Sequence, residues 1–372
     1  EETQETNFGL DLSFFKGRLN VETDFYIQRT SDLLDNEPLP TELGYSSMRI
    51  NAGTIRNIGW EIGITAYPID KRDWTWTTSL NWSTTRNKVL KISGEGGRIY
   101  KNNWWLEEGV AAGQFYGFKQ QGVYAYDASN AYTADYSERL LPVFQRDNNG
   151  NVMFDSGRNP IVSGYTYQDG QVFVGTPSKL TINGTVAQGG DVIWDDVNKD
   201  GNINDSDKQI LGNGYPKWFM GWNNSVRWKN LTFSFSFYYS HGGLVYNSLV
   251  YSLTRYGDNT SAADPRYVTQ GWRYQGQLTQ WHIPGANGNN GRSAVDNNRS
   301  LSSFYLEDGS YLRLQDVRLS YNFDEKIAAK MKMASLQAYI YGGNLMTWTK
   351  YRGYDPEIST GGVLNPGDDT QK

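Results

Sequence analysis

The chain has 372 residues, a formal net charge of −5, two histidines and no cysteine. Its charged residues are mixed along the sequence without a basic run, which argues against nucleic-acid binding because that function needs a clustered basic surface. No segment approaches the roughly 18 apolar residues of a membrane-spanning helix. Two histidines and no cysteine supply too few side chains for a Ser-His-Asp hydrolase or a His-liganded zinc enzyme, so we expect no enzymatic activity.

Eight stretches of the chain alternate apolar and polar residues with a period of two. A β-strand sends successive side chains to opposite faces, so each stretch has one apolar and one polar face. In chain order, the apolar sets run from Phe8 to Phe14, Leu19 to Ile27, Ile58 to Ile64, Trp74 to Trp82, Trp218 to Trp228, Leu231 to Phe237, Val317 to Phe323 and Leu336 to Ile340. The pattern predicts eight two-faced strands.

The connections between these strands are alternately short and long. Tight turns lie at 16–18, 70–73 and 229–230, a slightly longer link lies at 325–332, and long excursions occupy about 29–57, 87–215 and 240–310. Bacterial outer-membrane barrels have short periplasmic turns and long extracellular loops. We therefore predict an all-β protein that is a transmembrane antiparallel β-barrel, with two to four further strands inside the excursions.

Aromatic residues support a bacterial outer-membrane location. The chain has 13 Trp and 26 Tyr, and both residue types favour the headgroup level of a lipid bilayer. The absence of cysteine suits a protein that crosses an oxidising periplasm. No signal peptide precedes the first strand, and eight strands alone would leave two open edges in lipid, so we expect the chain to be a piece of a longer polypeptide.

Two local features near the end of the chain have structural interpretations. The apolar positions change parity between Leu314 and Val317, and one extra residue near Gln315 and Asp316 would restore a common face, as a β-bulge does. Asp355-Pro-Glu357 carries two carboxylates, but proline favours an extended or turn conformation there. We expect an exposed acidic turn rather than a catalytic pair.

One loop has the ligand spacing of a calcium site. Asp196 to Asp207 places oxygen-bearing side chains at EF-hand positions, with Gly201 at the sixth position, and Ile203 is expected to pack inward. The predicted structural Ca²⁺ ligands are Asp196, Asn198, Asp200, the carbonyl of Asn202, a water held by Asn204, and Asp207. The alternative is a solvated turn in which Asp and Asn side chains cap their own backbone.

The long excursions also hold aromatic residues that are candidates for ligand binding. Exposed rings stack on sugars or clamp peptides, whereas buried rings pack the loops on one another or on a partner. The candidates are Trp104, Trp105, Trp272, Tyr274 and Trp281.

Several motifs in this order resemble one protein family. They are Asn57-Ile-Gly-Trp-Glu61, Asp196-Val-Asn-Lys-Asp-Gly201, Gly309-Ser-Tyr-Leu-Arg-Leu314, Gly343-Asn-Leu345 and Asp355-Pro-Glu357. Together they resemble the SusC/RagA-type TonB-dependent outer-membrane transporters of Bacteroidetes. The resemblance covers residues 1–372 and implies the C-terminal portion of a plugged 22-stranded barrel.

The resemblance also implies a function and partners. Members of this family import oligosaccharides or peptides beneath a SusD-like surface lipoprotein, and TonB acts through an N-terminal part. We therefore expect that the plug, the TonB box and the N-terminal domain are not present in this chain. Two alternatives stay open, namely a passive outer-membrane porin, which shares the strand pattern, and a secreted β-rich protein that binds or cleaves glycans.

Overall fold

The computed structural model describes residues 1–38, 47–92, 97–101, 104–254, 263–284, 297, 302–357, 366–367 and 369. The chain forms two compact units. The first comprises Glu1–Phe115, Gly212–Val245 and Glu307–Asp368, and the second comprises Tyr116–Leu211, Tyr246–Leu306 and Asp369–Lys372. Among the described residues, none of the helices is both long enough and apolar enough to cross a membrane.

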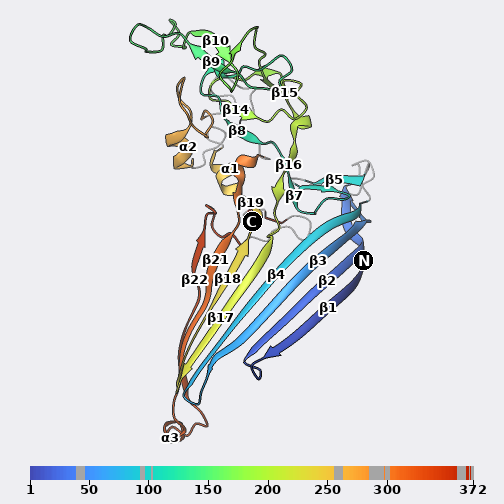
Figure 1. Cartoon of the computed structure of the whole chain (residues 1–372), viewed down its shortest axis with the longest axis vertical. Coiled ribbons are helices and arrows are strands. Elements are labelled where there is room, and N and C mark those ends of the chain that lie inside the picture. Colours follow the sequence, from blue (N-terminus) through green and yellow to red (C-terminus); the bar gives the residue numbers. More distant parts are fainter. Residues whose placement is uncertain are drawn as a thin grey trace. The chain divides into compact units, whose positions relative to one another are not determined.

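An eight-stranded antiparallel sheet dominates the first unit (Figure 1). In spatial order its strands are β1 (Glu2–Phe14), β2 (Leu19–Pro38), β3 (Ser47–Asp70), β4 (Trp74–Ile92), β17 (Trp218–Trp228), β18 (Leu231–His241), β21 (Tyr311–Asn322) and β22 (Gln337–Thr349). Each predicted stretch lies in one of these strands, apart from Phe323 and Leu336, which stand one residue outside β21 and β22. This confirms the period-two assignment.

Cross-strand register gives the sheet two chemically distinct faces. One row crosses all eight strands and is entirely apolar, consisting of Leu12, Val21, Ile64, Leu80, Trp222, Phe237, Leu314 and Met346. The next row contains polar residues and one glycine, and consists of Ser13, Asn20, Thr65, Ser79, Asn223, Ser236, Asp316 and Gly343. Because adjacent positions point to opposite sides, these rows define the apolar face and the polar face.

A bulge in β21 keeps these rows aligned. Against β18, Ser236 pairs with Asp316 and Phe237 with Leu314, so β21 has one extra residue between these pairs. The register against β22 also shifts there, from Met346 to Gly343. Gln315 is therefore the extra residue, as the parity change predicts.

The tight connections all lie at one end of the sheet, because consecutive strands are antiparallel. Three are turns of a few residues, and the fourth contains the helix α3 (Glu325–Lys330). The predicted excursion at 29–57 needs correction, since β2 continues to Pro38 and β3 begins at Ser47. A register shift between Thr30 and Leu33 breaks the alternation there without ending the pairing. Residues 39–46 lie outside the described residues.

The two outer strands are the most exposed part of this unit. Every residue of β1 is exposed, and so is every residue but one of β22. Within the described residues, each pairs with a neighbour on one side. A small apolar cluster packs at the other end of β3 and β4 and contains Leu33, Ile55, Val89, Ile92, Ile99, Leu106 and Ala112.

Short strands fill the two longest excursions, and those in the described residues form separate small sheets. One sheet contains β5 (Arg98–Lys101), β6 (Trp104–Glu107), β7 (Gln114–Gly117) and β16 (Gln209–Asn213), and a second pairs β8 (Gln120–Val123) with β14 (Val192–Trp194). A third contains β9 (Leu141–Phe144), β10 (Val162–Thr166) and β11 (Val172–Phe173), and a fourth contains β12 (Thr181–Ile182), β13 (Thr185–Val186) and β15 (Asn202–Ile203). The fifth pairs β19 (Leu244–Tyr246) with β20 (Leu306–Asp308). The expectation of further barrel strands within the excursions is therefore wrong for the described residues. These segments are too short to continue the long ladder.

The second unit has its own hydrophobic core. Its buried members include Phe118, Tyr124, Leu180, Ile182, Val192, Trp194 and Ile203. The helices α1 (Ser248–Thr254) and α2 (Pro265–Gln270) and the 3-10 turns η3 (Asp127–Ser129), η4 (Asp205–Asp207) and η5 (Ser303–Tyr305) complete the unit.

The two faces predict opposite responses to a buried charge in the complete protein. Phe235 lies on the apolar face between Phe233 and Phe237, with ring centroids 5.7 and 5.9 Å away. If that face meets lipid, Phe235→Arg should lower the free energy of unfolding by about 2–4 kcal/mol near the bilayer midplane. Unfolding titrations in lipid vesicles measure this. Asn223→Arg, on the polar face, is the control, and a larger loss there than at Phe235 would reverse the assignment.

Candidate functional site

A cavity of about 690 Å³ lies within the first unit, toward the long-loop end of the central strands. The strand residues that line it belong to the polar face. Phe219 and Tyr238 stack with ring centroids 6.1 Å apart, and Tyr238 lies 5.9 Å from Tyr311. The polar lining comes from Asn57, Thr85, Asn87, Ser240 and Glu357. Aromatic rings beside amide and hydroxyl groups are suited to bind a polar organic ligand.

A buried arginine organises one wall of this cavity. Arg313 is 6% exposed and forms ion pairs with Asp355, at 2.5 Å, and with Glu357. Its Nε donates to Thr347 Oγ1 at 3.1 Å, and its guanidinium carbon lies 5.0 Å from the Tyr311 ring centroid. A buried charge is costly unless it is paired and hydrogen-bonded, so both carboxylates are structurally required here.

This clamp explains two motifs that the sequence analysis treated separately. Arg313 belongs to the Gly309–Leu314 motif, and its partners belong to Asp355-Pro-Glu357. The acidic residues are half exposed, as expected of a turn, but their role is to neutralise an arginine about forty positions earlier in the chain. The sequence signal is the position of Arg313 between Leu312 and Leu314.

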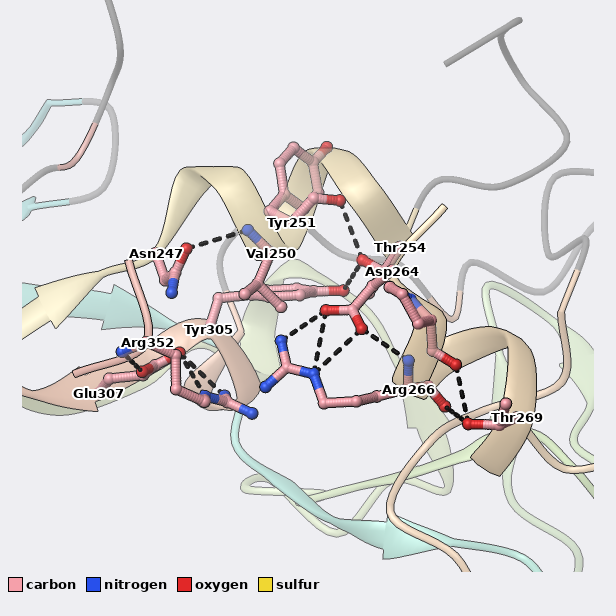
Figure 2. A network of polar contacts seen from close by, with 11 residues as sticks. Asn247, Val250, Tyr251, Thr254, Asp264, Arg266, Thr269, Tyr305, Glu307 and Arg352 are labelled. Atoms are coloured by element: carbon pink, nitrogen blue, oxygen red, sulfur yellow. Dashed lines mark hydrogen bonds and ion pairs between the residues drawn. The ribbon is translucent and has the colours of Figure 1, made fainter. Parts of the chain in front are cut away.

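Other polar anchors fix the loop segments in each unit (Figure 2). In the first unit, the nearly buried Glu307 accepts hydrogen bonds from the backbone and guanidinium of Arg352, the latter at 2.8 Å. In the second unit, Asp264 caps α2 by accepting from the Arg266 backbone and also pairs with its guanidinium at 2.5 Å. These contacts satisfy buried carboxylates and are structural.

The predicted calcium loop, Asp196–Asp207, lies in the second unit. Gly201 has φ +78°, and a Cβ there would meet the Tyr136 ring at 2.1 Å, so this position requires glycine. Ile203 is fully buried in the core, as predicted. The carboxylates accept backbone hydrogen bonds within the loop, with Asp196 bonded to Gly201 at 2.9 Å and Asp207 to Asn204 at 2.8 Å.

Two carboxylates in this loop are incompletely neutralised. Asp196 Oδ1 is buried without a hydrogen-bond partner. Burial raises the pKa of the fully covered Asp207 carboxyl, and the nearby Asp196 carboxylate adds to this rise. A cation would relieve both costs, so the donor set fits the predicted Ca²⁺. In the described part of the chain, however, no three His, Cys, Asp or Glu side chains are gathered in a metal-binding arrangement.

The predicted ligand-binding aromatics have different environments. Trp104, Trp272 and Trp281 are 3–6% exposed. Their neighbours are Phe115, the Ala125 carbonyl and Phe304, respectively. Burial favours the packing alternative for these three rings. Trp105 is partly covered and donates to Glu107 at 3.0 Å, whereas Tyr274 is 66% exposed and retains an accessible ring.

The two histidines are not equivalent. His241 ends β18 and packs beside Trp218 and Tyr239 at 5.0 and 6.0 Å between ring centroids. A loop histidine is typically at the surface, but His282 is 3% exposed. Its Nδ1 lies 3.2 Å from the Tyr267 hydroxyl, and its Nε2 is buried without a partner. Packing against Tyr267 from α2, which the local sequence does not reveal, accounts for the difference.

Comparisons with known proteins show whole-chain relatives. No protein-family model matches the chain. It is 35% identical over its full length to TonB-dependent receptor P39 of Formosa agariphila and 30% identical over 96% of its length to TonB-dependent receptor P3 of the same organism. It is 24% identical over 98% of its length to TonB-dependent receptor SusC of Bacteroides thetaiotaomicron. The chain spans 30–34% of the length of these relatives.

Solved structures agree on the fold. A structure of the RagAB peptide transporter matches the chain with a TM-score of 0.63 and 21% identity. The match covers 95% of this chain and 32% of the RagAB chain. The RagAB peptide importer in the open-open state matches 98% of the chain with a TM-score of 0.64 and 19% identity, again over 32% of its own chain.

The two-faced antiparallel sheet is therefore part of a TonB-dependent transporter barrel. The chain belongs to the SusC/RagA-type family of TonB-dependent receptors, as its motifs indicated.

His282 predicts a pH-dependent stability of the second unit. Burial lowers the pKa of His282 from 6.5 to about 4. Between these values the unfolded chain binds more protons than the folded unit, so stability is complete above the unfolded pKa and falls as pH decreases toward 4. The loss is at most on the order of 3 kcal/mol.

Hydrogen exchange of the second unit in the intact receptor, corrected for intrinsic pH effects, measures this loss. His282→Gln should flatten the profile between these pH values, and His241→Gln should leave it unchanged. Identical profiles for the wild type and His282→Gln would exclude His282 as the source.

Proposed function

We propose that the complete protein is an outer-membrane importer that takes up oligosaccharides or peptides in a TonB-dependent manner. The observation that carries this proposal is 35% identity to a TonB-dependent receptor along the entire chain. In this proposal the apolar face contacts the lipid bilayer, and the polar face with its 690 Å³ cavity lines the barrel interior. The exposed strands β1 and β22 continue into further strands, because open edges are costly in hydrocarbon.

In this proposal, energy coupling belongs to an N-terminal part of the complete protein. Loops outside the cell have no access to ATP, so uphill uptake would draw on TonB through a plug in the N-terminal part. A SusD-like surface lipoprotein would close over the loops. The RagAB structures are described as those of a peptide transporter and a peptide importer, which makes peptides one candidate cargo beside oligosaccharides.

The structure supports this proposal over a secreted glycan-binding protein. Such a protein would have to cover its apolar face with a dry core, yet large apolar side chains including Phe8, Trp60, Trp222 and Ile340 are 40–75% exposed. All tight turns also lie at one end of the sheet. A passive porin shares these properties, so an experiment is needed to distinguish it from a TonB-dependent importer.

Deleting the gene for the complete protein should abolish growth on one polymeric nutrient, and deleting TonB should have the same effect. Affinity purification from membranes should yield a surface lipoprotein at one-to-one stoichiometry. Growth of the TonB-deleted strain at the wild-type rate, with no lipoprotein in the purified sample, would instead support the porin.

We also propose that residues 196–207 bind a structural Ca²⁺. The support is the EF-hand spacing together with the buried, unpartnered Asp196 Oδ1. The hydrogen bonds within the loop support the alternative of a self-capped turn, in which no cation is needed.

Mutation of one predicted ligand tests the calcium proposal. Asp200→Ala in the intact receptor should abolish Ca²⁺ binding in calorimetry at millimolar concentrations and should raise protease sensitivity between residues 87 and 215. Asp205 provides the matched control, because its side chain is 84% exposed and pairs with Lys208 outside the ligand positions. A wild-type receptor that shows no binding at millimolar Ca²⁺ would leave the self-capped turn as the explanation.

A further inference from the structure

Strand β8 has an open edge in the second unit. It pairs with β14 on one side, where Tyr124 N donates to Asp191 O at 2.9 Å. In this register, Val123 is opposite Val192 in a non-hydrogen-bonded pair, so the N–H and C=O of Val123 point away from β14. Among the described residues, neither group has a hydrogen-bond partner. The edge therefore presents one donor and one acceptor with the spacing of a β-ladder.

The positions on either side of Val123 along the same edge are already paired. Gln120 N donates to Ser303 Oγ at 2.9 Å, and Ala125 O accepts from Gly276 N at 2.7 Å. The open position is thus a window about one residue long rather than a free strand edge. Such a window can pair with one residue of an extended chain, but the paired positions beside it prevent a full strand from adding to this edge.

A cavity of about 430 Å³ lies against this window. Its walls come from β8, from the residues leading into β9 and from segment 278–280, where Leu278 is 89% exposed. Tyr126 and Phe144 line it as an aromatic pair with ring centroids 4.6 Å apart. The cavity therefore offers an apolar wall beside a backbone donor and acceptor.

The same cavity contains a cation without a counter-charge. Arg139 lines it and is half buried. Across the described ranges, the Arg139 guanidinium has no ion pair and no hydrogen bond, whereas buried Arg313 has three partners. An arginine that is partly withdrawn from water favours an anionic group, and its planar donors match a carboxylate.

We propose that this cavity binds a short extended peptide that carries a carboxylate. The C=O and N–H of one peptide residue pair with Val123, the carboxylate pairs with Arg139, and an apolar side chain packs on Tyr126 and Phe144. An ordered donor and acceptor on one β-residue match a peptide backbone, whereas sugar hydroxyls do not require that pairing. This inference rests on the proposed import function and specifies peptides as the cargo class.

Binding of synthetic peptides to the intact, detergent-purified receptor tests the proposal. The probe is an N-acetylated heptapeptide of alternating valine and threonine with a free carboxylate, compared with its C-terminal amide. Arg139→Gln should weaken binding of the carboxylate form by about tenfold and remove its advantage over the amide. Val123→Pro deletes an N–H that β14 does not use, and should weaken both forms.

Two matched variants control for general damage. Val123→Ala keeps the backbone donor, and Arg158→Gln removes an exposed arginine from the same unit, so both should bind as the wild type does. Equal affinity for the acid and amide peptides, or equal effects of Arg139→Gln and Arg158→Gln, would overturn the proposal. Competition by neutral maltohexaose at the peptide's own affinity would also overturn it.

These results are separable from the proposed function. Peptide binding in detergent does not need TonB, so binding without TonB-dependent uptake supports the peptide site and contradicts the importer. TonB-dependent growth on a glycan, with no peptide binding to the purified receptor, contradicts the peptide site and leaves the importer in place.

Discussion

The structure depends on the pairing register of one eight-stranded sheet. Backbone pairing fixes which residues are neighbours, and the period of two assigns every neighbour to a face. Trp222, Phe237 and Leu314 share a row with apolar residues on each of the remaining strands of the sheet. The adjacent row is polar apart from one glycine. A slip of one residue would exchange these rows. The bulge at Gln315 prevents such a slip within β21, because it absorbs the single residue by which the two halves of that strand are out of phase.

The polar face acquires its chemistry where the strands meet the loops. There a buried arginine, Arg313, is neutralised by two carboxylates from a later turn, and one of these, Glu357, also lines the cavity. Removing either carboxylate would leave a poorly compensated buried charge, which costs more than the pair itself contributes. The clamp and the cavity wall are thus a single structural feature, in which the acidic turn neutralises Arg313.

The second unit has several polar groups that its own residues do not satisfy. Asp196 Oδ1 and His282 Nε2 are buried without partners, and the Arg139 guanidinium has none among the described residues. Buried polar groups are normally hydrogen-bonded, so the two buried atoms carry a desolvation cost, whereas the half-buried Arg139 keeps contact with water. A carboxylate oxygen attracts a cation and a guanidinium attracts an anion, whereas burial lowers the pKa of His282 and keeps its ring neutral at ordinary pH. Loops that carry function on a rigid sheet commonly have this property.

Local pattern was sufficient to predict the eight strands, their two faces, the bulge at Gln315 and the roles of Gly201 and Ile203, because each depends on neighbours within a few positions. The candidate calcium ligands follow from spacing in the same way. Only the tertiary structure placed the excursion strands in separate sheets, buried Trp104, Trp272 and Trp281, enclosed His282, and joined Arg313 to Asp355. These properties depend on contacts between distant segments, and a ring or a charge carries the same local signature whether it is covered or exposed. The sequence thus determines which residues face which side of the sheet, and long-range packing decides which of them are free to bind.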